Sequence, residues 1–329
     1  MATEVIKTIK PSGGDYISLN AFEAGEQRDL TAVDEIAIAE CYSMSDTTSV
    51  AINGWTTDST RFIKITTPLT ERHDGKWNTG KYRIEINGTD GIVNYEDYVT
   101  IEGLQIEITA SSVNNLEGLV ILGGNINNKT TVDKTIIRGV ISGTSTLCSG
   151  IRAQDGDAII DITNSVIYGF NTNLNYGIRC QGNIHNVFNS VVAGCTWGIN
   201  GESAVTITNC AVFNNNDDVV GTFTLTYSAG DDVDFATGTG NVQWLSGSID
   251  WNTNFTNYAT GDFSVKDSAA NIYNAGVDLS GSGVTDDIIG TSRPQSAVYD
   301  IGAFELAAPP SVTGGGPRGL FGIGQMGLR

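Results

Sequence analysis

The sequence predicts an all-β protein: a single-stranded right-handed parallel β-helix with a short N-terminal capping helix and a flexible Gly/Pro-rich C-terminal tail. Two observations lead to this fold class. The 329 residues include 40 glycines and only 6 prolines, a composition typical of many short strands separated by tight turns. Short motifs also recur at intervals of 20 to 27 residues, as expected when a chain returns to the same place in successive coils.

Two kinds of motif recur. A segment ending in two apolar residues occurs at 137–141, 163–167, 188–192 and 208–212. Each copy is followed by a turn that carries Gly143, Gly169, Gly194 or Asn214, and the first three continue to a Gly-Ile pair at Gly150, Gly177 and Gly198. Strands of neighbouring coils pair about 4.8 Å apart and alternate inward and outward side chains. We therefore expect a continuous Ile/Val/Leu core, with stacked asparagines that bond from one coil to the next at the turns.

The chain divides into three regions. Residues 1–33 are expected to form an N-terminal strand and capping helix, in which Ser18 caps an amphipathic helix to Leu30, interrupted by Gly25, that covers the first coil. Residues 34–306 are expected to form about ten or eleven coils, irregular and rich in aromatic residues toward the C-terminal end. Residues 307–329 switch to proline and glycine, a composition that cannot fold alone.

Charge and cysteine content exclude several classes of protein. With 37 acidic against 18 basic residues, the formal charge is -19, which argues against nucleic-acid binding. We expect no membrane span and no signal peptide, so that the chain folds in the cytoplasm of the cell that makes it. The five cysteines are odd in number and lack a C-x-x-C pair, so we expect buried free thiols, without disulfides or zinc. These are Cys41, Cys148, Cys180, Cys195 and Cys210.

Segments at both ends of the chain carry a family resemblance. On the N-terminal side they are Thr8–Tyr16, Glu71–Trp77, Tyr82 and Arg83, and on the C-terminal side Arg293, Pro294 and Tyr299–Glu305. The first group resembles the opening of pectin-lyase-like β-helix proteins encoded by tailed phages and prophages, and the second resembles the last coil of many β-helix surface proteins. The resemblance implies a virion protein of the decoration, spike or fibre type, commonly a homotrimer.

Enzymes of this fold that cleave polysaccharides use clustered carboxylates assisted by a basic side chain. Arg152, Asp155, Asp157 and Asp161 form one such candidate set, expected on one lateral face. The alternative is a solvated turn at Asp155 and Asp157, with Asp161 pointing outward from a strand.

A second acidic set comprises Asp217, Asp218, Asp231, Asp232 and Asp234. It is a candidate for calcium binding or acid-base chemistry, and the alternative is a group of ordinary turn aspartates. The active-site patterns of polysaccharide lyases and hydrolases are not recognisable as complete sets. The sequence thus leans against catalysis and predicts no cofactor and no metal.

The sequence supports binding of sugars better than it supports catalysis. Trp55, Trp197 and Trp244 are candidate platforms for sugar rings, with packing in the core or in loops as the alternative. The tail is a candidate docking peptide for other virion proteins, with a disordered end as the alternative. Its candidate contact residues are Pro317, Arg318, Leu320, Phe321 and Ile323.

The predicted function is that of a non-enzymatic structural protein of a phage particle, a capsid decoration or a head or tail spike or fibre. It presents a rigid β-helical surface and binds host polysaccharide. The alternative is a polysaccharide depolymerase of the tailspike type, a lyase or a glycoside hydrolase. The expected location is the virion, and the expected partners are other virion proteins, further copies of the same chain and host polysaccharide.

Overall fold

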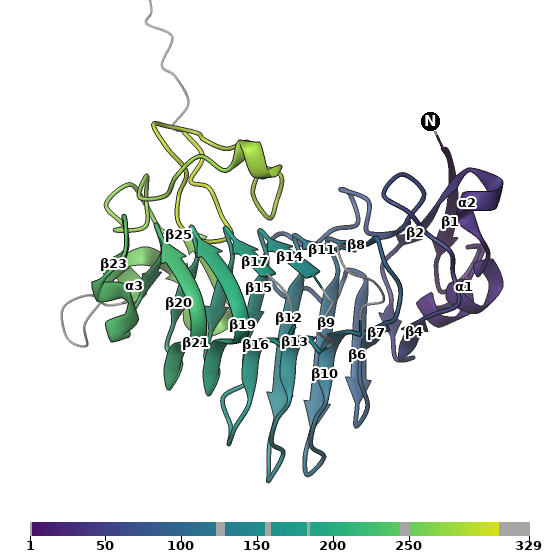
Figure 1. The fold of residues 1–329 in the computed structure, drawn as a ribbon, viewed down its shortest axis with the longest axis horizontal. Helices are drawn as coiled ribbons and strands as arrows, with labels where there is room; N and C mark the ends of the chain where they lie inside the picture. Colours follow the sequence, from purple (N-terminus) through teal and green to yellow (C-terminus); the bar gives the residue numbers. More distant parts are fainter. Residues whose placement is uncertain (1, 123–128, 155–158, 183–184, 244–250, 309–329) are drawn as a thin grey trace, which may run out of the picture.

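The predicted fold class is confirmed. The structure, a computed structural model, describes residues 2–122, 129–154, 159–182, 185–243 and 251–308. Short parallel strands stack into a helix with three lateral faces, and the N-terminal helices lie at one end of the stack (Figure 1). Each coil visits the first, second and third face in turn, and every strand pairs with its equivalent in the neighbouring coil.

The three faces are defined by their strands. The first face comprises β4 (Val50–Ile52), β7 (Ile92–Asn94), β10 (Glu117–Ile121), β13 (Ser149–Ala153) and β16 (Tyr176–Cys180). The second face comprises β2 (Glu35–Cys41), β5 (Ile63–Thr66), β8 (Val99–Glu102), β11 (Lys129–Asp133), β14 (Ile159–Thr163) and β17 (His185–Phe188), with β1 (Thr3–Ile9) on its outer edge. The third face comprises β3 (Ser45–Asp46), β6 (Arg83–Asn87), β9 (Gln105–Ala110), β12 (Ile136–Ile141), β15 (Val166–Tyr168), β18 (Val191–Ala193), β20 (Ala211–Phe213), β22 (Ala229–Gly230) and β23 (Val242–Gln243).

Two long strands join the first and second faces. The first half of β19 (Trp197–Thr208) pairs with β16 and its second half with β17, and β21 (Asp217–Thr226) pairs along β19 in the same way. In the described residues, seven coils carry strands on all three faces, from β4 to β22. They span roughly 30 Å at the spacing of paired strands.

The Gly-Ile pairs and three of the four segments ending in two apolar residues occupy equivalent places in the coils, since Ile167, Val192 and Val212 pair in register. The predicted alignment of 137–141 is wrong: Ile136 and Ile137 pair with Val166 and Ile167, and Val140 is exposed. Ile151, Ile178 and Ile199 pair in register on the first face and are buried in the inner core. Asn189 and Asn209 occupy the same turn in successive coils with φ angles of 44° and 56°, and the Asn209 amide donates to Asn189 Oδ1 at 3.2 Å. The predicted core and the predicted bond between stacked asparagines are thus both present. All five cysteines are free and buried.

Both ends of the inner core are covered. Helix α1 (Leu19–Glu26) begins at Ser18, whose hydroxyl accepts from the Ala21 amide, and buries Leu19 and Phe22 against the first coils. The chain does not continue the same helix to Leu30: α1 ends at Glu26, and a separate short helix, α2 (Leu30–Val33), starts after Asp29, whose side chain caps it. At the other end, Phe235 of the 3-10 helix η1 (Val233–Ala236) enters the core.

The structure differs most from the prediction in the last part of the chain, where coils were expected to continue to residue 306. The strands of the stack end at β23, and residues 251–308, here called the C-terminal segment, lie alongside the coils (Figure 1). The segment contains α3 (Trp251–Asn254), an antiparallel pair of β24 (Phe255–Asn257) and β25 (Asp262–Val265), and the 3-10 helices η2 (Tyr258–Thr260) and η3 (Ser280–Ser282).

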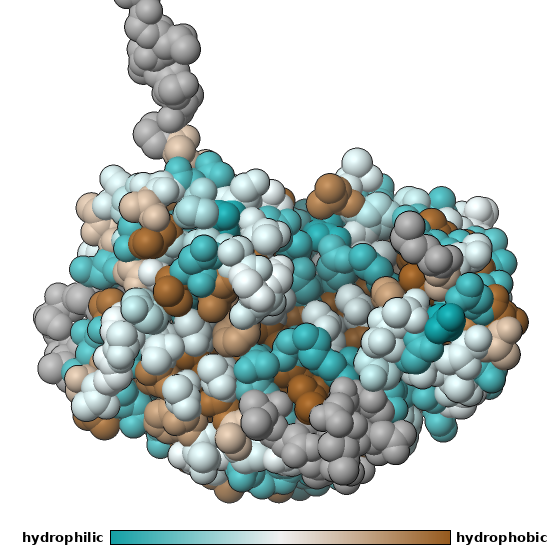
Figure 2. Space-filling view, turned by 45° about the horizontal axis from the view of Figure 1, so that its top comes forward, coloured by the Kyte–Doolittle hydropathy of each residue, from teal (hydrophilic) through white to brown (hydrophobic). Residues whose placement is uncertain are grey.

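A second hydrophobic core explains this placement. Val166, Val191 and Ala211 point outward from the third face and are covered by side chains of the C-terminal segment, among them Phe263 and Ile301. A third-face strand is therefore buried on both sides, which is why its sequence motif ends in two consecutive apolar residues. On the face drawn in Figure 2, hydrophobic residues are scattered among hydrophilic ones. No helix in the described ranges has the length and apolar character needed to cross a membrane.

Candidate functional site

An aromatic pair lies on the first face. Tyr176 and Trp197 open β16 and β19 and pair in register, and their rings are in contact at a tilt, with centroids 4.7 Å apart and an interplanar angle of 37°. Both come directly before a glycine of the Gly-Ile motif, so successive coils place them in one column. Tyr176 is buried and Trp197 is half-buried. The outer ring of this pair thus offers an apolar surface supported by the ring beneath it.

A network of arginines and carboxylates borders the aromatic pair. Arg152 and Arg179 pair in register three positions further along the strands, and the Arg179 guanidinium lies 5.1 Å from the centroid of the Tyr176 ring. Arg179 Nε donates to Glu202 Oε1 at 2.7 Å, and Arg152 Nη1 lies 3.3 Å from Glu117 Oε1. The arginines are therefore held in place, and each retains further N–H donors for a ligand.

Glu117 is the most perturbed group of this network. Burial, followed by the neighbouring Asp90, raises the pKa of Glu117 to about 8 against the opposing effect of Arg152. The Asp90 carboxylate also accepts from the Glu117 backbone amide at 2.9 Å. Near neutral pH the Glu117 carboxyl group therefore holds a proton that an exposed glutamate would have lost.

Replacing Glu117 with glutamine should flatten the pH dependence of stability. Because the folded pKa of Glu117 is raised above its ordinary value of 4.5, its stabilising effect is complete below pH 4.5 and is lost as the pH rises through about 8. The wild-type chain should lose up to about 1.4 kcal/mol per pH unit in this window relative to Glu117→Gln. Urea unfolding between pH 4 and 9 measures the difference, with exposed Glu4→Gln as control. Parallel pH profiles for wild type and Glu117→Gln would contradict this assignment.

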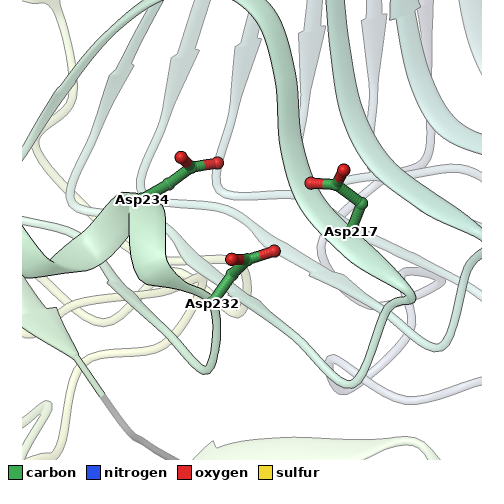
Figure 3. A group of neighbouring side chains, drawn as sticks. All are labelled: Asp217, Asp232 and Asp234. Carbon is green, nitrogen blue, oxygen red and sulfur yellow. The ribbon is translucent and has the colours of Figure 1, made fainter.

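Three aspartates gather at the end of the aromatic column. Asp217 pairs in register with Trp197, Asp232 caps η1, and Asp234 lies in the first turn of η1 (Figure 3). One carboxylate oxygen from each lies within 4.8 Å of the other two. Partial burial, followed by repulsion among the three, raises the pKa of Asp217 and of Asp234.

A second acidic pair lies behind this group. Asp218 is buried, accepts from the Asp231 backbone amide at 3.1 Å, and has a strongly raised pKa because of burial and of the facing Asp231 carboxylate. Asp218 is held by the Asn215 amide at 2.8 Å, so that it fixes the turn rather than faces a ligand. The second predicted acidic set is thus brought together, since β21, β22 and η1 follow one another in a single coil.

Carboxylate oxygens are the ligands that hard cations such as Ca²⁺ prefer, and Ca²⁺ takes six to eight of them. Asp217, Asp232 and Asp234 offer up to six oxygens, and a bound cation would offset their mutual repulsion. The residue types therefore fit a calcium ion in chemical terms. This fit alone does not assign a metal to the site.

The first predicted catalytic set is divided between faces. Arg152 belongs to β13 on the first face, whereas Asp161 belongs to β14 on the second face, where it pairs with Lys129 Nζ at 2.5 Å. The two strands lie on different faces of the coil, so residues close in sequence point in different directions. Asp155 and Asp157 lie outside the described residues.

The predicted tryptophan platforms differ in their surroundings. Trp197 is in the aromatic pair, whereas Trp55 is buried in the N-terminal cap, stacked on Phe22 at 6.1 Å. Trp244 lies outside the described residues, as do the candidate docking residues of the tail.

Sequence reasoning missed Tyr176, Arg179 and Glu117. A signal for Tyr176 was present, because Tyr176 and Trp197 each come directly before a Gly-Ile pair, and that shared position already aligned the two rings. Glu117 and Arg152 are separated by a long connection of irregular length, so no repeat related them before the fold was known.

Comparisons with known proteins identify no family. No family description matches the chain, and no curated protein matches it. Among solved structures, the chain is similar to one described as the crystal structure of pectate lyase Pel9A, with 14% identity, a TM-score of 0.48, and coverage of 93% of this chain and 97% of that chain. This likeness is too distant to transfer any activity or site residue, and the fold assignment rests on the strand pairing described above.

Proposed function

We propose that this chain is a non-enzymatic structural protein of a phage particle and that its first face binds glycans. The observation that carries the glycan-binding role is the aromatic pair of Tyr176 and Trp197, flanked by Arg179 and by Asp217 in register. Aromatic rings bind the apolar faces of sugars, and nearby guanidinium and carboxylate groups bind their hydroxyl groups. The β-helix supports this role because it holds these side chains on a rigid, regularly spaced face.

Replacing Trp197 with alanine should weaken glycan binding about 30-fold, the loss typical of a central aromatic residue in an interface. The measurement is isothermal titration of purified protein with a panel of bacterial capsular polysaccharides. Tyr95→Ala is the matched control, since it removes an aromatic ring that is 45% exposed and lies outside the aromatic column. Binding that is equally strong in Trp197→Ala and Tyr95→Ala, or no binding of any polysaccharide by wild type, would overturn the glycan-binding role.

The second part of the proposal is that the chain is assembled into a phage particle. It is supported by the resemblance of the N-terminal segments to phage-encoded β-helix proteins and by a rigid stack suited to display on a particle. In this proposal the tail docks onto other virion proteins and the chain assembles as a homotrimer. Antibody labelling of purified particles tests it: many copies on the head indicate a decoration protein, and a few on the tail indicate a spike or fibre. Particles that carry no label exclude the virion role.

A depolymerase is the second candidate function, favoured by the carboxylates of Asp217, Asp232 and Asp234 beside the aromatic pair. Incubation with the same polysaccharides, with calcium or with a chelator, separates the two functions. New reducing ends, or absorbance from unsaturated uronates, would establish cleavage. Binding without either product supports the non-enzymatic role.

A further inference from the structure

A small hollow lies where the third face of one coil leads into the first face of the next. It has a volume of about 220 Å³ and lies where the third-face strands β15, β18 and β20 end, next to η2 and β25 of the C-terminal segment. Residues from both parts of the chain line it, so the hollow exists only while the C-terminal segment covers the third face.

The floor of the hollow is formed by a repeated turn. Gly169, Gly194 and Asn214 directly follow β15, β18 and β20, and their φ angles are 88°, 62° and 56°. These left-handed positions are the Gly- or Asn-bearing turns that recur in the sequence. Where glycine stands, no side chain covers the backbone, so a ligand can approach it closely.

Aromatic rings form the walls. Tyr168 and Tyr258 line the hollow together with Phe263, and the rings of Tyr168 and Phe263 meet edge to face with centroids 5.6 Å apart. Tyr168 and Tyr258 are half-buried, so each keeps part of its ring surface accessible. The walls are thus rigid and apolar, with phenol hydroxyls at their edges.

Two side-chain amides complete the lining. Asn171 and Asn214 are exposed at the rim, and neither amide side chain has a hydrogen-bond partner in the part of the chain that the structure describes. Each amide offers both a donor and an acceptor, the combination that pairs with neighbouring hydroxyl groups. Among the described residues, no charged side chain lines the hollow.

We propose that this hollow binds a single uncharged sugar ring, such as the terminal or branching unit of a glycan. Its volume is below the roughly 300 to 1,000 Å³ of pockets for larger ligands, which fits one ring. The tyrosines contact the C–H face of the ring, and Asn171 and Asn214 bind its hydroxyl groups. The absence of charged lining selects against uronic acids and amines. This site goes beyond the glycan-binding role of the first face and does not depend on it.

The proposal is tested with a substitution that fills the hollow and leaves its tyrosine and asparagine side chains in place. Ala259 is exposed and lines the hollow, so Ala259→Trp places an indole in it, whereas Ala297→Trp adds the same ring at an exposed alanine of the same segment that does not line it. The probes are the methyl glycosides of glucose, galactose, mannose and N-acetylglucosamine, and the readout is saturation-transfer NMR titration.

We expect at least one methyl glycoside to bind the wild-type chain, and Ala259→Trp to weaken that binding more than 10-fold. Ala297→Trp should bind the same probe as wild type does. The proposal is overturned if none of the four probes binds wild type, or if Ala259→Trp binds as tightly as Ala297→Trp. Because Trp197→Ala is scored with polysaccharide and Ala259→Trp with single sugars, failure of one site is distinguished from failure of the other.

Discussion

Replacing Arg293 with methionine is expected to lower the free energy of unfolding of the C-terminal segment by about 3–5 kcal/mol, the usual effect of removing one partner of a buried ion pair. The Arg293 side chain is fully buried and lies 2.8 Å from Glu305 Oε2. It also donates to the carbonyl oxygens of Gly302 at 2.9 Å and of Asp300 at 3.2 Å. Methionine fills a similar volume but leaves the Glu305 carboxylate buried without a counterion.

The effect should be local. Arg293 and Glu305 both belong to the C-terminal segment, which covers the outward apolar residues of the third face. We expect limited proteolysis and hydrogen exchange to show early opening of residues 251–308 in Arg293→Met, while the stacked coils stay protected. The hollow described above should open as well, and its sugar binding should be lost.

The matched control is Arg61→Met. Arg61 also makes two ion pairs, with Asp34 and Asp58, but these are partly exposed, and exposed pairs contribute about 1 kcal/mol or less. Equal stability losses in Arg293→Met and Arg61→Met would show that the buried pair does not hold the segment in place.

Replacing Gly177 with alanine is expected to destabilise the coil stack by about 1–3 kcal/mol, as overpacking does in a rigid core. A Cβ atom at Gly177 would lie 2.7 Å from the carbonyl oxygen of Gly198 and 2.5 Å from Val192 Cγ1. The carbonyl oxygen belongs to the next coil, so it cannot move without disturbing the strand pairing. The Gly-Ile motif therefore recurs because a side chain at this position would push the coils apart.

Gly281→Ala is the control for this variant, since a Cβ atom at Gly281 meets no atom within 4 Å. Its stability should stay within about 0.5 kcal/mol of wild type. Urea unfolding followed by circular dichroism measures both variants. If Gly177→Ala is as stable as Gly281→Ala, close contact between successive coils is not what the glycine column provides.

The fold was predictable because short sequence motifs recur once in each of several successive coils. The Gly-Ile pairs at Gly150, Gly177 and Gly198 lie at one place in the coil, and three of the four segments ending in two apolar residues lie at another. Loops of irregular length separate these motifs but do not hide the repeat, because strand pairing does not fix the length of a loop.

The C-terminal segment was not predictable in the same way. Its Phe263 and Ile301 are apolar like core residues of a coil, and only the structure shows that they pack on the outer side of the third face. A signal was nevertheless present in the motifs. Val166 and Ile167 are consecutive and both buried, one in each core, which indicates a strand covered on both sides.

The candidate site was predictable in part. Trp197 and the acidic set around Asp217 and Asp232 were identified from residue type and grouping. The alignment of Trp197 with Asp217 in one column was not predictable, because it depends on the register in which the strands of successive coils pair. The contact between Arg152 and Glu117 depends on the register of β10 with β13 and on the length of the chain that connects these strands.

The proposed functions depend on coils that stack in register, and distances between spin labels test this stacking most directly. Lys64, Asn186, Thr206 and Thr224 belong to one outward column of the second face. Labels at Lys64 paired in turn with each of the other three should give narrow distributions that lengthen by about 4.8 Å per coil, from roughly 19 to 29 Å between backbones. Broad distributions, or distances that do not increase in equal steps, would contradict the stacked β-helix and the functions proposed for its faces.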